Sequence, residues 1–103
     1  MSYPISIVRL SHLADGDLDS IRDFIFDNNP SAANDTLEEL FNTLELLAAN
    51  PGIGQRRDDL WPLLRLFSVR PYVIMYQVAA GGIHVVRIVH GARDFPSLFS
   101  HDS

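Results

Sequence analysis

The spacing of apolar residues changes along the chain, and each change predicts a different kind of element. Residues 4–10 alternate between apolar and polar positions around Ile5 and Ile7, which predicts a first strand. Within residues 12–28 the apolar positions recur every three or four residues, as on one face of a helix. Ser11 directly precedes this segment and is a favourable N-cap residue.

A second helix is predicted almost directly after the first. Asn29 can serve as its N-cap and Pro30 as its first residue, where the missing N–H of proline costs nothing. A sustained apolar stripe then runs from Ala33 to Ala48, and residues 50–52 (Asn-Pro-Gly) end it. Since so few residues join the two helices, they must lie antiparallel as a helical hairpin.

Residue types that favour strands dominate the second half of the chain. We expect strands at 63–69, 72–79 and 83–89, and the short turns between them predict an antiparallel meander. The order strand, helix, helix, strand, strand, strand predicts an α+β fold. In this fold an N-terminal strand and an antiparallel helical hairpin accompany an antiparallel sheet that ends in the three-stranded meander. We expect a single domain over residues 1–103.

The last two predicted strands are apolar on both faces, although a helical hairpin can cover only one face of a sheet. In the strand at 72–79, one face holds Tyr72, Ile74, Tyr76 and Val78, and the other face holds Val73 and Met75. In the strand at 83–89, Val86 and Ile88 are expected on the face opposite to Val85 and Val89. The remaining face must be covered by the C-terminal segment with Phe95, Leu98 and Phe99, by a partner chain, or by both.

Composition excludes several classes of protein. Of the 103 residues, 47% are hydrophobic and 20% are charged, which is typical of a folded domain and not of a disordered chain. Cysteine is absent from the sequence, which excludes a disulfide scaffold, a zinc–thiolate site and a cysteine nucleophile. Without a signal-like start or an apolar run long enough to span a membrane, we expect a cytoplasmic protein with no membrane partner.

Charge is distributed unevenly along the chain. The net charge is −5, and every basic residue is an arginine. Residues 1–50 hold two arginines and nine acidic residues, whereas residues 51–103 hold six arginines and four acidic residues. Such acidity argues against direct binding of nucleic acid. Arginine suits bidentate contacts with carboxylates, although a codon preference for arginine would explain its use equally well.

Two arginines, Arg65 and Arg87, lie within predicted strands among apolar neighbours. A charged side chain in such a position must reach water or a carboxylate. One interpretation is an ion pair with Asp58, Asp59 or Asp94 at an edge of the sheet. The other is a pair of arginines that faces the carboxylates of a partner protein.

His90 ends the last predicted strand. It is either a general acid or base, or a histidine whose ring is hydrogen-bonded to backbone or to the C-terminal segment. Arg93 and Asp94 are expected to form an ion pair that anchors this segment, whose apolar residues either fold back on the sheet or engage a partner. The spacing of the histidines does not indicate a metal site, and we expect neither a metal nor a cofactor.

Short sequence motifs occur in an order that resembles the ParE branch of the RelE/ParE superfamily, the toxins of type II toxin–antitoxin (plasmid stabilisation) modules. The resemblance covers about residues 8–96. In chain order the motifs are Leu10-Ser11, Asp17-Leu18-Asp19-x-Ile21 with Phe24-Ile25, Asn29-Pro30-x-Ala32-Ala33, Asn50-Pro51-x-Ile53-Gly54, Leu64-Arg65-x-Phe67-x-Val69, Tyr72-x-Ile74-x-Tyr76-x-Val78 and Val85-x-Arg87-Ile88-x-His90-Gly91-Ala92-Arg93-Asp94.

The resemblance implies the fold derived above and two partners. The first is a cognate ParD-like antitoxin, whose C-terminal segment would fold onto the toxin in a hetero-oligomer. The second is a cellular target, because ParE-like members inhibit DNA gyrase. Residues expected to bind target or antitoxin are Arg65, Arg87, His90, Arg93, Phe95, Leu98 and Phe99.

RelE-like members of the superfamily instead cut mRNA on the ribosome, which leaves an enzymatic alternative. That chemistry needs cations around the phosphate and a group that moves a proton. Candidate cations are Arg56, Arg57, Arg65, Arg87 and Arg93, and the candidate proton carriers are His90 and His101. With no lysine in the chain and no tyrosine after residue 93, no complete catalytic set is visible, so we expect a protein that is not an enzyme. A third possibility is a degenerate module that only binds an antitoxin.

Overall fold

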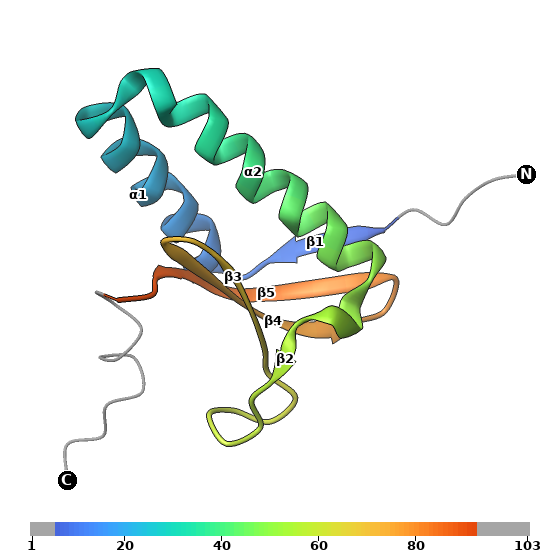
Figure 1. Ribbon diagram of the computed structural model, residues 1–103. Helices are drawn as coiled ribbons and strands as arrows, with labels where there is room; N and C mark the ends of the chain where they lie inside the picture. The colour runs from blue at the N-terminus through green and yellow to red at the C-terminus, as the bar shows by residue number, and fades with distance from the viewer. Residues whose placement is uncertain (1–5, 93–103) are drawn as a thin grey trace, which may run out of the picture.

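The computed structural model describes residues 6–92, without the side chains of residues 32 and 33, and its two helices cover one face of a five-stranded sheet (Figure 1). In chain order the elements are β1 (Ile7–Leu10), α1 (His12–Asn28), α2 (Pro30–Ala49), a 3-10 turn (Pro51–Ile53), β2 (Gln55–Arg56), β3 (Arg65–Val69), β4 (Tyr72–Ala79) and β5 (Gly82–His90). The predicted α+β fold is confirmed. Neither helix is both long and apolar enough to cross a membrane.

The strands lie in the order β1-β5-β4-β3-β2. The predicted meander is present, because β3, β4 and β5 pair antiparallel in sequence. β1 pairs parallel with β5, so that Ile7 lies opposite Gly82 and the sheet is mixed. The sequence did not indicate this neighbour, because the helical hairpin separates β1 from every other strand. The pairing of the two-residue β2 with β3 was not predicted either, since two residues carry no periodicity.

The two helix starts differ in how they are capped. Ser11 caps α1 as predicted, because its Oγ accepts a hydrogen bond from Ala14 N–H at 2.9 Å. The same hydroxyl donates to the carbonyl of Val86 at 2.7 Å, which ties the start of the helix to β5. Asn29 occupies the predicted N-cap position of α2 but forms no side-chain capping bond. Its Oδ1 instead accepts a hydrogen bond from Ser31 Oγ at 3.0 Å.

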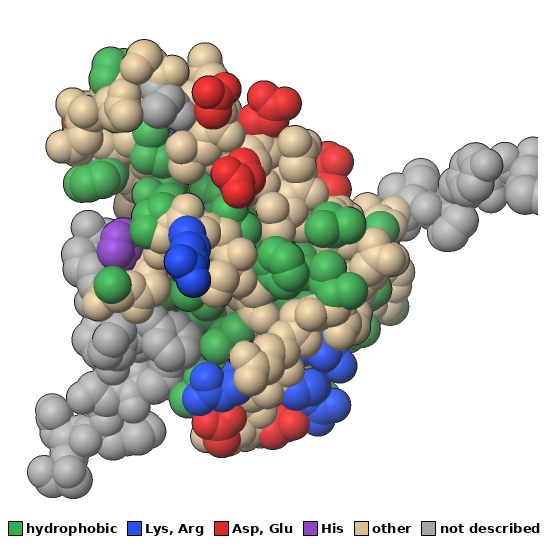
Figure 2. All heavy atoms as spheres, viewed as in Figure 1, with side chains coloured by type: hydrophobic (Ala, Val, Ile, Leu, Met, Phe, Trp, Pro, Cys, Tyr) green, Lys and Arg blue, Asp and Glu red, His purple; other side chains and the backbone are tan. Residues whose placement is uncertain are grey.

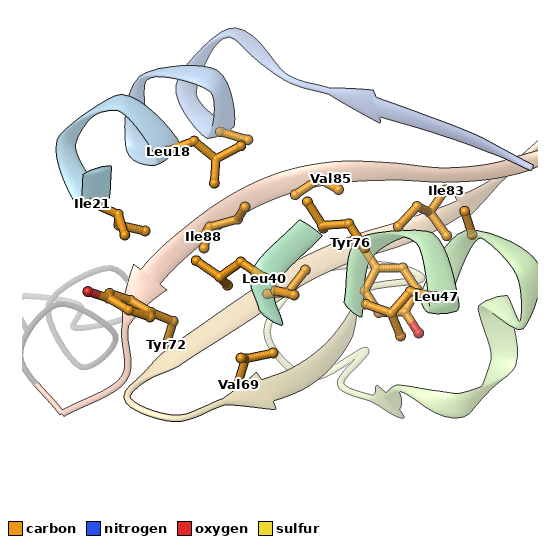
Figure 3. Close-up of a cluster of buried hydrophobic side chains, with 14 of the residues drawn as sticks. Leu18, Ile21, Leu40, Leu47, Val69, Tyr72, Tyr76, Ile83, Val85 and Ile88 are labelled. Atoms are coloured by element: carbon orange, nitrogen blue, oxygen red, sulfur yellow. The ribbon is translucent and has the colours of Figure 1, made fainter. Parts of the chain in front are cut away.

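The main core fills the space between the hairpin and the sheet (Figure 3). Its buried members are Ala14, Leu18, Ile21 and Ile25 from α1, Leu40, Leu44, Leu47 and Ala48 from α2, and Val69, Tyr72, Ile74, Tyr76, Ile83, Val85 and Ile88 from the strands. Helical periodicity therefore identified the buried stripe of both helices. Phe41, within the predicted stripe of α2, is instead 49% exposed, because its side chain projects toward β1 at the margin of the core.

A β-bulge in β5 changes which residues face the helices. The pairing with β4 passes from Val85 to Arg87, so Val86 is an additional residue without a partner of its own. As a result Val85 and Ile88 both belong to the main core, whereas Val86 and Val89 lie in a second apolar cluster. The predicted opposition of Val86 and Ile88 to Val85 and Val89 is wrong, because one inserted residue shifts the alternation of everything after it.

The face of the sheet away from the helices is also apolar, as the sequence predicted. Its cluster contains buried Leu64, Met75 and Val89, with Leu60, Leu66, Val73 and Val86 packed against them. Among the described residues, Leu60 and Leu64 bring the connection between β2 and β3 onto this face. Phe95, Leu98 and Phe99, the proposed cover from the C-terminal segment, lie outside the described residues.

Tyr76 fixes the turn that follows α2. Its side chain is fully buried, and its hydroxyl donates to the carbonyl of Pro51 at 2.8 Å and accepts from Gly54 N–H at 2.9 Å. Burial raises the pKa of the Tyr76 phenol, so the hydroxyl remains a donor over the ordinary pH range. Gly54 permits this approach because a Cβ at that position would overlap the tyrosine hydroxyl.

We predict that Gly54→Ala destabilises the protein by about 1–3 kcal/mol, because the methyl group displaces a fully buried ring. Gly52→Ala is the matched control, since a Cβ there meets no atom within 4 Å, and its effect should stay within about 0.5 kcal/mol. Urea unfolding of both variants and the wild type measures the difference. Equal unfolding midpoints for the two alanine variants would contradict the contact.

Candidate protein-interaction site

Asp17 joins α1 to the edge of β5. Its Oδ2 accepts from Arg87 Nε at 2.7 Å and its Oδ1 accepts from Arg87 Nη2 at 2.8 Å, which makes the ion pair bidentate. Oδ2 also accepts from the backbone N–H of Ile88 at 3.0 Å. The two side chains are only 15% and 26% exposed. Limited contact with water strengthens such a pair and makes the loss of either partner costly.

The short length of β1 explains why this contact exists. β1 covers β5 only as far as Val85, which lies opposite Leu10. Beyond that point α1 provides the partners, because Ser11 N–H donates to the carbonyl of Val85 at 2.9 Å and Asp17 accepts from Ile88 N–H. The first half of the helix thus satisfies backbone groups that would otherwise form an open sheet edge.

His90 lies near this ion pair, at the end of β5. Its ring packs edge to face on Tyr72, with 6.1 Å between the ring centroids. The two rings contribute to a small cavity of about 80 Å³ between α1 and the ends of β4 and β5. Asp17 and Phe24 line the side of this cavity formed by α1. The cavity combines an acidic group, aromatic surface and an imidazole.

Arg65 lies apart from this cluster. It is opposite Tyr76 in the β3–β4 pair, whereas His90 is opposite Tyr72. Those two tyrosines are four residues apart on β4, about 13 Å along the strand. Arg65 Nη1 donates to the carbonyls of Gly52 at 3.1 Å and Gly54 at 2.7 Å. It therefore holds the same turn as Tyr76 does.

The predicted site residues thus do not form one cluster. Arg87 and His90 come together, Arg65 is separate, and Arg93, Phe95, Leu98 and Phe99 lie outside the described residues. The interpretation that Arg87 pairs with Asp58 or Asp59 is wrong, because those carboxylates bind Arg56 and Arg57, whereas Arg87 binds Asp17. Asp94, the third carboxylate considered, lies outside the described residues. Within residues 6–92, no group of three or more potential ligands could hold a metal ion.

Asp17 is the important residue that the sequence did not single out. One signal was available, because Asp17 lies three residues after Ala14 and four before Ile21, on the apolar face of α1. A carboxylate on that face requires a cationic or N–H partner. The partner is 70 residues away in the sequence, and periodicity within a helix does not reveal contacts at that range.

Comparison with known proteins gives consistent results for sequence and structure. The sequence profile described as "ParE toxin of type II toxin-antitoxin system, parDE" matches residues 8–95. Toxin ParE3 of Caulobacter vibrioides is 35% identical over 77 residues, which are 74% of this chain and 77% of that protein. Toxin RelE2 of the same organism is 42% identical over 77 residues, which are 75% of this chain and 85% of that protein.

Two further matches extend the comparison. Toxin ParE1 of Mycobacterium tuberculosis is 34% identical over 87 residues, which are 82% of this chain and 89% of that protein. A solved structure titled "Chromosomal ParDE TA system from P. aeruginosa" superposes with a TM-score of 0.69 at 22% identity. It covers 85% of this chain and 98% of that one, which shows a shared fold.

We predict that Arg87→Ala lowers the free energy of unfolding by about 1–3 kcal/mol, because it removes two hydrogen bonds from a mostly buried carboxylate. Arg22→Ala is the matched control. Arg22 pairs with Asp19 on the same helix, but those side chains are 52% and 61% exposed, so its loss should cost less than about 0.5 kcal/mol. Chemical denaturation compares them, and an Arg87→Ala variant as stable as Arg22→Ala would show that the pair contributes nothing.

Proposed function

The chain belongs to the ParE toxin family of type II toxin–antitoxin systems, and from this membership we propose that it inhibits bacterial growth by binding DNA gyrase. We propose further that it acts in the cytoplasm, that it is not an enzyme, and that a cognate ParD-like antitoxin neutralises it. The fold and relatives support a toxin of such a system. We favour a binding protein over an enzyme because of the groups that the arginine side chains contact.

The arginines suggested as catalytic cations are held in internal contacts wherever the structure describes them. Arg87 binds Asp17, and Arg65 binds two backbone carbonyls. Arg56 and Arg57 bind the neighbouring carboxylates Asp58 and Asp59. Cleavage of RNA needs cations directed at the phosphate that is attacked. This engagement of the arginines is the observation that favours a binding protein.

A groove between β1 and α2 supports an antitoxin partner. It has a volume of about 180 Å³ and is lined by Val8, Leu10, Phe41, Leu44 and Glu45. α2 contains four acidic residues and no basic ones. Acidic side chains accordingly gather over the helices in Figure 2, whereas lower on the same face arginines lie beside further acidic side chains. An antitoxin segment with apolar residues and basic neighbours would fit this groove and could fold as it binds.

The same proposal assigns partner binding to the residues expected from the sequence. They are Arg65, Arg87, His90, Arg93, Phe95, Leu98 and Phe99. The cavity beside His90 supports one part of that surface, at the ends of β4 and β5.

An mRNA interferase is the second candidate function. It is favoured by the similarity to Toxin RelE2, whose identity over the matched region is 42%. A degenerate module that only binds an antitoxin is the third candidate.

Induction of the chain alone in a bacterial host distinguishes these functions. We predict filamentation, an SOS response and loss of supercoiling activity when purified gyrase is incubated with the protein. Co-expression of the cognate antitoxin should restore growth. Rapid translational arrest with mRNA cut at codon positions would establish the interferase instead, and unimpaired growth would indicate the degenerate module.

A further inference from the structure

The connection between β2 and β3 presents two large apolar side chains to water. Trp61 is 61% exposed and Leu63 is 62% exposed, the highest values among the large hydrophobic residues that the structure describes. In Figure 1 this connection projects from the sheet on the side away from the helical hairpin. We call residues 57–64, with these two side chains, the Trp61 loop.

Leucine at position 63 does not contribute to the stability of the fold as a glycine there would. Its φ angle is +63°, in the left-handed region that favours glycine and strains a residue with a branched side chain. Its side chain also gains little from burial, because most of it is exposed. Glycine would remove the strain and lose almost no packing. The presence of leucine therefore opposes stability and suggests a role in binding.

Hydrogen bonds hold the loop in this strained conformation. Asp58 Oδ1 accepts from Leu63 N–H at 2.8 Å, and Gln77 Nε2 on β4 donates to the carbonyl of Pro62 at 3.0 Å. Leu64, the next residue, is buried in the second apolar cluster and anchors the end of the loop. A loop fixed in this way loses little conformational entropy when a partner binds it.

The charges around the loop largely cancel. Arg56 pairs with Asp58 at 2.7 Å and Arg57 pairs with Asp59 at 2.9 Å. Contact with Leu63 N–H and then with Arg56 holds the pKa of Asp58 below its usual value. With each arginine next to its own carboxylate, the loop offers a partner apolar surface more than net charge, so binding through it should depend weakly on salt.

We propose that the Trp61 loop inserts Trp61 and Leu63 into an apolar pocket of the folded cellular protein that this toxin inhibits. This inference rests on the proposed function as a toxin. A convex and rigid loop fits a preformed pocket of a folded partner. The groove between Val8 and Phe41 instead offers a concave surface to an antitoxin segment that folds on binding. The two partners would therefore contact different surfaces.

A titration to low pH tests the hydrogen bond between Leu63 N–H and Asp58 that holds the loop. Because the pKa of Asp58 is lower in the folded protein than in the unfolded chain, its contribution to stability is complete above the unfolded value near 4. That contribution is lost as the pH falls through the folded pKa, when the carboxylate facing Leu63 N–H, Arg56 and Arg65 becomes neutral. We predict that the mobility of Trp61, the only tryptophan in the sequence, increases as the pH falls through the folded pKa of Asp58, which lies below the ordinary value near 4.

Fluorescence anisotropy of Trp61 measures this loosening. In Asp58→Ala the indole should already be mobile at neutral pH, whereas Asp59→Ala should retain the acid-dependent step. A rigid indole in Asp58→Ala at pH 7 would contradict the assigned contact.

Three variants test the docking surface itself. Trp61→Ala and Leu63→Gly remove the two apolar groups, and Leu13→Ala removes an equally exposed leucine from α1, where the side chain is 59% exposed. Each is compared with the wild type by urea unfolding, by affinity for the cognate antitoxin and by the inducer dose that halves growth. We expect Leu63→Gly to unfold at an equal or higher urea concentration and to bind antitoxin within twofold of the wild type. Its growth inhibition, like that of Trp61→Ala, should fall at least tenfold, while Leu13→Ala changes none of the three.

The possible outcomes separate this inference from the proposed function. A toxic wild type whose gyrase assay is negative would refute gyrase as target, whereas a tenfold loss of toxicity in both loop variants would still support the docking surface. Loop variants as toxic as the wild type would overturn the inference. The inference would also be overturned if the loop variants lost affinity for the antitoxin but kept their toxicity. It would be overturned as well if sedimentation showed that the wild type is a dimer and that the loop variants are monomers of equal toxicity. A wild type without any effect on growth would contradict both proposals.

Discussion

The structure depends on how β5 obtains hydrogen-bond partners along both of its sides. β4 pairs with one side over the whole strand, but β1 is only four residues long and covers the other side as far as Val85. α1 completes that side with the backbone and hydroxyl of Ser11 and the carboxylate of Asp17. This need fixes the position of the helix relative to the sheet. The core beneath α1 and the cavity beside His90 follow from that position.

Local patterns in the sequence predicted most of the fold, for reasons visible in single residues. The buried positions of α1 follow helical periodicity because one side of that helix faces the sheet. Ser11 was predicted as a cap because its role is set by a residue three positions away. The parallel pairing of β1, the bulge at Val86 and the pair between Asp17 and Arg87 were not predicted. The parallel pairing and the ion pair join residues 70 to 75 positions apart, and the bulge is an irregularity in the pairing of β4 with β5; a periodic pattern within one element reveals none of these.

The candidate site was predicted less completely than the fold. Residue type correctly marked Arg65 and Arg87 as charges that require partners, but it did not identify the partners that the structure describes, Asp17 for Arg87 and two backbone carbonyls for Arg65. Arg65 binds carbonyls of a turn that becomes its neighbour only when β2 pairs with β3. The strain at Leu63 was equally invisible, because a positive φ at a leucine is a property of the folded loop. The contacts of Arg65 and Arg87 and the conformation of Leu63 are thus set by tertiary structure and not by local preference.

The bulge at Val86 has a consequence for how chains of this fold can differ in length. Because Val86 has no partner on β4, its removal would leave every other residue of β5 opposite its present neighbour. A deletion elsewhere in β5 that retained the bulge would instead shift the residues beyond it by one position and exchange their two faces. Removal of Val86 would take away the acceptor of the Ser11 hydroxyl and one side chain of the second cluster. The bulge is therefore the place where this strand accommodates a missing residue most readily, and homologous chains should lose or gain length there.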